Sequence, residues 1–296
     1  MSYVNIPNTD LSNICSFLAS LYVDLTPSYG CLKESPQVES DRCYTSTNLL
    51  AEYVLRNLCK NTALADKVKA FLNAYPTDFY DYTQILLLRP FTLPFTTVEH
   101  VLVDIVNNIK IYHIKRTDIE LPDYYEYANL LALKSALHIF NGDFNQARYE
   151  LDRLSALFNG YGFKDKAYQV LGKYETYKLA LAIIPSKSLG ISDKVALYTN
   201  TLNKISPVTS LYTVDPSGNL VGEGDLNVET ASLIAIALYS TIPYDIIPRS
   251  LIAIPVFERP LRIEYIGIIQ SMLNIVIILA VIISILGILI RLRLRW

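Results

Sequence analysis

Acidic side chains in the loops that precede several expected helices are the residues best suited to chemistry. Two carboxyl groups held about 5 to 10 Å apart can act as proton donor and proton acceptor, for example at a glycosidic bond. A glycoside hydrolase or a polysaccharide lyase would use such a pair. The candidate catalytic residues in these loops are Glu34, Asp165, Glu175, Asp225 and Glu229. Asp41 is a further acid in a loop that precedes an expected helix.

Some of these acids have a second interpretation, as helix-terminal residues. Glu126, Glu175 and Glu229 stand at equivalent places in three similar segments, each at the expected start of a helix. A carboxylate in the first turn interacts with the free amides and the positive end of the helix, which contributes about 0.3 to 1 kcal/mol. A catalytic pair is normally unique in a chain, so the recurrence favours the stabilising role. Whether the protein is an enzyme stays open at this point.

No motif indicates a metal ion, a nucleotide or another cofactor. The sequence has no Walker loop, no Gly-x-Gly-x-x-Gly after a strand, no His-Glu-x-x-His and no Gly-x-Ser-x-Gly. His100, His113 and His138 lie far from one another and from the cysteines, which excludes a zinc pattern. With 26 basic and 28 acidic side chains the net charge is -2, so nucleic acid is not an expected partner.

The cysteines predict disulfide bonds. Cys15, Cys31, Cys43 and Cys59 are the only cysteines of the chain, and all lie near its start. An even, clustered set suits two disulfides, in any of three connectivities. Buried free thiols are the alternative, because a cysteine on a helix often serves as a small apolar side chain.

The elements that would position these residues are expected to be helices. Apolar residues recur three and four positions apart through most of residues 10–250, and the alternating pattern of strands is scarce. Thr96-Thr97-Val98-Glu99 and Asp143-Phe144-Asn145-Gln146 both fit the capping box that starts a helix. The sequence therefore predicts an all-α domain.

Similar segments recur along this domain. They read YEYANLLAL at 125–133, YETYKLALA at 174–182 and VETASLIAI at 228–236, with a weaker copy, TSTNLLAEY, at 45–53. The interval of about fifty residues between the three clear copies fits one helical hairpin and a loop per repeat. Paired helices in a ring or a solenoid follow from this spacing.

The opening of the chain resembles a known family. The segments GCLKESP at 30–36 and NLLAEYVL at 48–55 are similar to the GLxxEsP and NLLAxYxL opening of uncharacterised archaeal proteins with a C-terminal membrane anchor. More broadly, the chain resembles the α/α-toroid, or six-hairpin glycosidase-like, superfamily. The resemblance implies an incomplete toroid of helical hairpins, whose inner helices converge on a cleft that takes glycans. It is carried by Gly30, Leu32, Glu34, Ser35, Pro36, Asn48, Leu49, Leu50, Ala51 and Tyr53.

The C-terminal region predicts a membrane span. Residues 265–290 contain no ionisable side chain except Tyr265 and are long enough to cross a hydrocarbon core of about 30 Å. A helical domain at 1–257 and a linker at 258–264 would precede this helix, and a basic tail at 291–296 would follow it. The lipid bilayer is then a partner, and the residues expected at its interface are Arg291, Arg293, Arg295 and Trp296.

Two rules disagree about the side of the membrane on which the domain lies. The C-terminal arginines favour an extracellular domain, yet the first thirty residues contain no Lys or Arg and show no signal peptide. Three functions remain as hypotheses. The first is a cell-surface binding or structural module, with a glycan or another membrane or surface protein as its partner. The second is a membrane-tethered glycosidase or polysaccharide lyase, and the third is a cytoplasmic tail-anchored helical-repeat adaptor.

Tyrosines bear on the first hypothesis, because the chain has 22 of them. Their rings stack on sugar faces and their hydroxyl groups form hydrogen bonds, although tyrosines more often fill helix interfaces.

Overall fold

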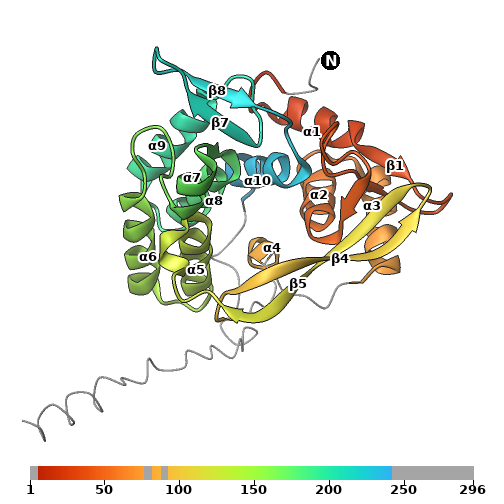
Figure 1. Cartoon of the computed structure of the whole chain (residues 1–296), viewed down its shortest axis with the longest axis horizontal. Helices are drawn as coiled ribbons and strands as arrows, with labels where there is room; N and C mark the ends of the chain where they lie inside the picture. Colours follow the sequence, from red (N-terminus) through yellow and green to blue (C-terminus); the bar gives the residue numbers. More distant parts are fainter. Residues whose placement is uncertain (1–5, 77–81, 88–92, 242–296) are drawn as a thin grey trace, which may run out of the picture. The chain divides into compact units, whose positions relative to one another are not determined.

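The computed structural model describes residues 6–76, 82–87 and 93–241, all within a compact unit that spans Met1–Pro255. About half of the described residues are helical and about a fifth lie in strands, which form three separate sheets (Figure 1). The prediction of an all-α toroid is therefore wrong, and the fold combines α and β structure.

Helices form most of the interior. They are α1 (Leu11–Ser20), α2 (Thr45–Asn57), α3 (Thr62–Ala74), α4 (Tyr82–Leu86), η1 (Tyr124–Glu126, a 3-10 helix), α5 (Ala128–Phe140), α6 (Phe144–Ala156), α7 (Lys166–Leu171), α8 (Thr176–Ser188), α9 (Ser192–Asn203) and α10 (Val228–Tyr239).

The helices pack in a closed circuit. α10 packs between α2 and α8, α8 packs on α5, and α4 contacts both α2 and α5. α3, α6 and α9 each pack on the helix before them.

The similar segments of the sequence lie at the starts of α2, α5, α8 and α10. Most residues of these helices are buried, and every residue of α10 from Thr230 to Ala237 is buried, as expected for a helix enclosed by others. α6 is amphipathic and lies outside them. Its predicted N-terminal cap is confirmed, because Asp143 Oδ1 accepts the amide hydrogen of Gln146 (3.2 Å).

A long hairpin replaces the helix start predicted at Thr96. β4 (Thr96–Val106) pairs antiparallel with β5 (Ile109–Glu120), and β3 (Arg42–Tyr44) pairs parallel with β5 on its other side. Asn107 and Asn108 join the two long strands with φ of 51° and 64°. Left-handed Asn residues suit the tight turns whose twist matches that of paired strands, and the β-branched residues around them favour strands.

Two smaller sheets complete the described part. β1 (Tyr22–Asp24) pairs with β2 (Gly30–Leu32), and β6 (Tyr174–Glu175) pairs with β7 (Leu211–Val214), which pairs with β8 (Leu220–Glu223). α2 begins directly after β3, and α8 begins directly after β6. Sheet hydrogen bonds therefore fix the backbone at the starts of these two helices.

The four cysteines form two disulfide bonds. Cys15 of α1 is bonded to Cys59, which lies just beyond α2, and Cys31 of β2 is bonded to Cys43 of β3. The first bond joins residues 44 positions apart and the second residues 12 positions apart. This is one of the three connectivities that the sequence left open. One bond links α1 to the end of α2, and the other links the β1–β2 sheet to the sheet that contains β3.

The prediction of a membrane protein is not supported by the described structure. No helix in the described part of the chain is both long and apolar enough to cross a membrane. The longest of them have 13 residues, or about 20 Å, which is shorter than a hydrocarbon core of about 30 Å. The predicted span at 265–290, its linker and the interface residues Arg291, Arg293, Arg295 and Trp296 lie outside the described residues.

Candidate functional site

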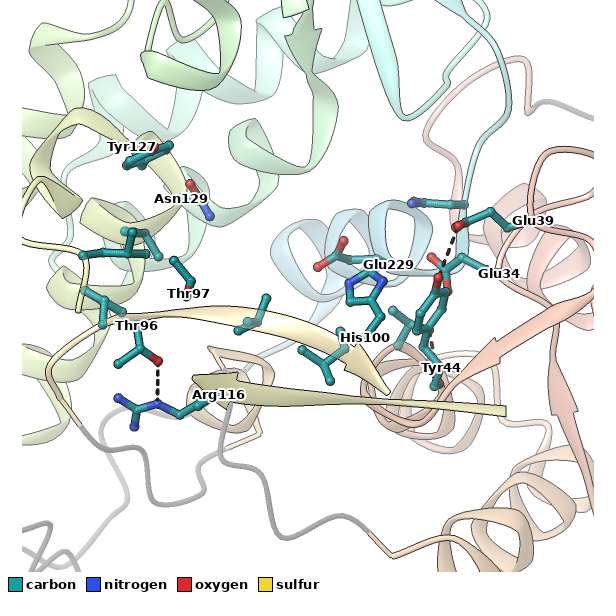
Figure 2. A pocket seen from close by; sticks show the side chains of 17 residues that line it. Glu34, Glu39, Tyr44, Thr96, Thr97, His100, Arg116, Tyr127, Asn129 and Glu229 are labelled. Carbon is teal, nitrogen blue, oxygen red and sulfur yellow. Dashed lines mark hydrogen bonds between the residues drawn. The ribbon is translucent and has the colours of Figure 1, made fainter. Parts of the chain in front are cut away.

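A cavity of about 500 Å³ lies between the hairpin and the N-terminal ends of three helices (Figure 2). Thr47 of α2, Asn129 of α5 and Glu229 of α10 reach it from the helices. β4 and β5 supply the opposite wall, and the loop after β2 supplies Glu34. The cavity thus gathers side chains from parts of the chain that are distant in sequence.

Glu34 is fixed at the start of α10. Its amide donates to the carbonyl of Arg42 (2.8 Å), and its own carbonyl accepts the amide hydrogen of Val228 (2.9 Å). The Oγ1 hydroxyl of Thr47 donates to Glu34 Oε2 (2.7 Å), and the backbone amide of Glu229 also donates to this carboxyl group. The residue is only 3% exposed. Two backbone and two side-chain hydrogen bonds therefore hold Glu34, with its carboxyl group at the edge of the cavity.

The surroundings of Glu34 favour its neutral form. Burial raises the pKa of Glu34 well above its ordinary value, and the negative charges of Glu229 and Glu39 raise it further. The hydrogen bonds from Thr47 and from the amide of Glu229 act in the opposite direction but do not reverse the shift. A carboxyl group with a raised pKa is suited to serve as a proton donor.

Glu229 lies beside Glu34 on the cavity side of α10. His100, which projects from β4, lines the same cavity, as Figure 2 shows. The ring of His100 packs edge-on against Tyr44, with centroids 5.2 Å apart. The hydroxyl of Tyr44 donates to Glu39 Oε1 (3.2 Å). One end of the cavity is therefore rich in carboxyl groups, with an imidazole and a phenol beside them.

Hydroxyl, amide and guanidinium groups lie at the other end of the cavity. Arg116 of β5 donates from Nε to Thr96 Oγ1 (3.1 Å) and from a terminal nitrogen to the carbonyl of Pro94. Burial lowers the pKa of Arg116. Figure 2 shows Tyr127 and Asn129 on this side, away from the carboxyl groups. The lining also includes five apolar side chains, Phe95, Val98, Ile114, Leu121 and Leu130.

Two of the predicted catalytic acids, Asp165 and Glu175, lie elsewhere, and Asp165 holds two helix starts. Asp165 accepts the amide hydrogens of Ala128 (3.0 Å), at the start of α5, and of Tyr168 (3.1 Å), in α7. The ammonium group of Lys178 lies 2.6 Å from Asp165 Oδ2 and 2.5 Å from Glu175 Oε2. Asp165 and Glu175 therefore share one cation, Lys178, and neither of the two acids lines the cavity.

Asp225 also makes contacts that organise the backbone. Its Oδ2 accepts the amide hydrogens of Gln37 and Val38 (2.9 Å each), which lie in the loop after Glu34. Asp41 pairs with Lys110 of β5 (2.6 Å) at a site that does not line the cavity. Of the five candidates, the cavity thus brings together Glu34 and Glu229.

Sequence reasoning missed the residues that the hairpin contributes, above all His100 and Arg116. The predicted all-α domain has no hairpin, whereas the paired strands β4 and β5 bring both residues to the cavity that Tyr44 also lines. The signal that could have found them is Asn107-Asn108 between two β-branched runs, a typical hairpin pattern.

No group of three or more His, Cys, Asp or Glu residues in the described ranges is arranged to hold a metal ion. Comparison with models of known protein families, with curated proteins and with solved structures finds no match to this chain. The function is therefore argued from the geometry of the cavity.

Proposed function

We propose that the protein binds a glycan in this cavity. The observation that carries the proposal is the lining, which combines polar groups at both ends of the cavity with five apolar side chains. A sugar has the same two kinds of surface, because its hydroxyl groups surround an apolar ring face. The volume of about 500 Å³ lies within the range of about 300 to 1,000 Å³ that is usual for ligand sites.

Binding to a glycan array tests this proposal, followed by calorimetry with the glycan that is retained best. Glu229→Gln is expected to weaken binding about tenfold or more, because it removes a charged acceptor for sugar hydroxyl groups. Glu99→Gln is the matched control, since Glu99 is exposed on β4 and does not line the cavity. The proposal is wrong if the wild-type protein retains no glycan, or if both variants bind as the wild type does.

Cleavage of the bound glycan is a second candidate function, favoured by the raised pKa of Glu34 beside Glu229. Neutral Glu34 would protonate the departing glycosidic oxygen, while ionised Glu229 would take a proton from the attacking water. Glu34→Gln is then expected to slow the release of reducing ends about a hundredfold or more. Unchanged hydrolysis by this variant, or no hydrolysis by the wild-type protein, would leave binding as the function.

Stability against pH provides an independent check on Glu34. Its folded pKa is raised by burial, so the stability that the neutral form provides is complete below the unfolded pKa, near 4.5. This stability is lost as pH rises toward the folded pKa. Gln cannot ionise, so Glu34→Gln should show a smaller fall in the free energy of unfolding over that interval. Urea denaturation of the wild-type protein and the variant at a series of pH values measures this difference. Parallel curves of unfolding free energy against pH would show that the pKa of Glu34 is not shifted.

A further inference from the structure

Aromatic rings lead from the cavity to the outer surface of α6. Phe95 lines the cavity, and its ring centroid lies 5.8 Å from that of Tyr124 in η1. The ring of Tyr124 lies 6.0 Å from that of Tyr125. The guanidinium of Arg153 lies 4.9 Å from the centroid of Tyr125 and 5.6 Å from that of Tyr149. We call Phe95, Tyr124, Tyr125 and Tyr149 the aromatic track.

Exposure increases along the aromatic track. Phe95 is buried and Tyr124 is partly buried, whereas Tyr125 is 44% exposed and Tyr149 is 56% exposed. Within the described part of the chain, the hydroxyl groups of Tyr125 and Tyr149 make no hydrogen bond. The outer tyrosines therefore present ring surface and an available hydroxyl group to solvent.

The inner part of the aromatic track is held rigidly. The ammonium group of Lys134 lies 4.2 Å from the ring centroid of Tyr124 and donates to its hydroxyl (2.8 Å). Glu150 is buried, and it lies 3.4 Å from Lys134 and 3.3 Å from Arg153. These ion pairs fix Arg153, and with it the surface between Tyr125 and Tyr149, before any ligand arrives.

We propose that the aromatic track binds the sugars that follow those in the cavity, so that the ligand is a glycan chain rather than a single sugar. The inference rests on the proposed glycan binding and extends it to the length of the ligand. Exposed tyrosine rings stack on sugar faces, and the guanidinium of Arg153 donates hydrogen bonds to hydroxyl groups. The occupant is argued from proximity, because Phe95 lines the cavity and its ring packs on Tyr124, next to the exposed ring of Tyr125.

The test uses a series of oligosaccharides, from disaccharide to octasaccharide, of the glycan that the array selects. Wild-type affinity is expected to increase with length. The double variant Tyr125→Ala, Tyr149→Ala should bind the octasaccharide about tenfold more weakly and the disaccharide as well as the wild type does. Tyr161→Ala is the control, because Tyr161 is 43% exposed and belongs to neither the cavity nor the aromatic track. Circular dichroism and thermal unfolding verify that each variant is folded.

Each outcome separates the two proposals. Equal wild-type affinity for all lengths, or an equal loss for all lengths in the double variant, would overturn the role of the aromatic track and leave the cavity proposal intact. Failure of the wild-type protein to bind any member of the series would overturn both. A loss confined to the long oligosaccharides would establish the aromatic track.

Discussion

Lys178→Met is expected to lower the free energy of unfolding by about 3 to 5 kcal/mol. The ammonium group of Lys178 is almost fully buried between Asp165 Oδ2 and Glu175 Oε2, at 2.6 and 2.5 Å. Methionine fills a similar volume but leaves two carboxylates without their cation, one of them completely buried. Guanidinium denaturation at neutral pH measures the loss.

A surface ion pair supplies the matched control. Lys67 lies 2.8 Å from Asp24, and the side chains of the two residues are 43% and 59% exposed. An exposed pair of this kind contributes about 0 to 1 kcal/mol, so Lys67→Met should change stability little. Adding Asp165→Asn to Lys178→Met should recover part of the loss, because the remaining buried charge is reduced. Similar stability in the two single lysine variants would refute the assignment of Lys178 as a buried structural cation.

Loss of the disulfide between Cys15 and Cys59 is expected to cost about 4 kcal/mol in the chain-entropy model. The bond closes a segment of 44 positions, and opening that loop gives the unfolded chain more freedom. Replacing both cysteines with alanine and measuring urea denaturation under oxidising conditions tests this expectation.

The second disulfide provides an internal comparison. Cys31 and Cys43 are 12 positions apart, so the same model gives a smaller loss of about 3 kcal/mol for their replacement by alanine. If the Cys15 and Cys59 double variant were as stable as the wild-type protein, the bond would make no contribution to folding.

Helical segments that are buried on most sides could be recognised from the sequence. Residues 45–53 and 228–236 lie at the starts of α2 and α10, where dense apolar spacing and small side chains agree with a packed helix. The hairpin could not be recognised in this way. Its apolar residues Val98, Val101, Leu102 and Ile105 follow the spacing of one helix face, although three of them are β-branched residues that favour strands. Tertiary pairing with β3 and the Asn107-Asn108 turn decide between the two.

The candidate site was predictable only in part. Glu34 and Glu229 were recognised as acids that precede or begin helices, but so were Asp165 and Glu175, which are bound to Lys178. The two pairs of acids differ in the helices that bring them together, which the sequence does not show. Glu34 meets Glu229 because α10 packs beside α2, a contact across nearly the whole described chain. Its burial and the resulting pKa shift arise from that contact.

The position of α10 has a consequence for biosynthesis. α10 is the last described helix, yet the loop that carries Glu34 bonds to its first residue, Val228, and Asp225 bonds to Gln37 and Val38. A nascent chain that has not yet released α10 from the ribosome leaves the inward sides of α2 and α8 uncovered. Contacts so distant in sequence also slow folding. The early part of the chain must therefore wait for the late part, and in that interval its apolar helices are open to chaperones and to aggregation.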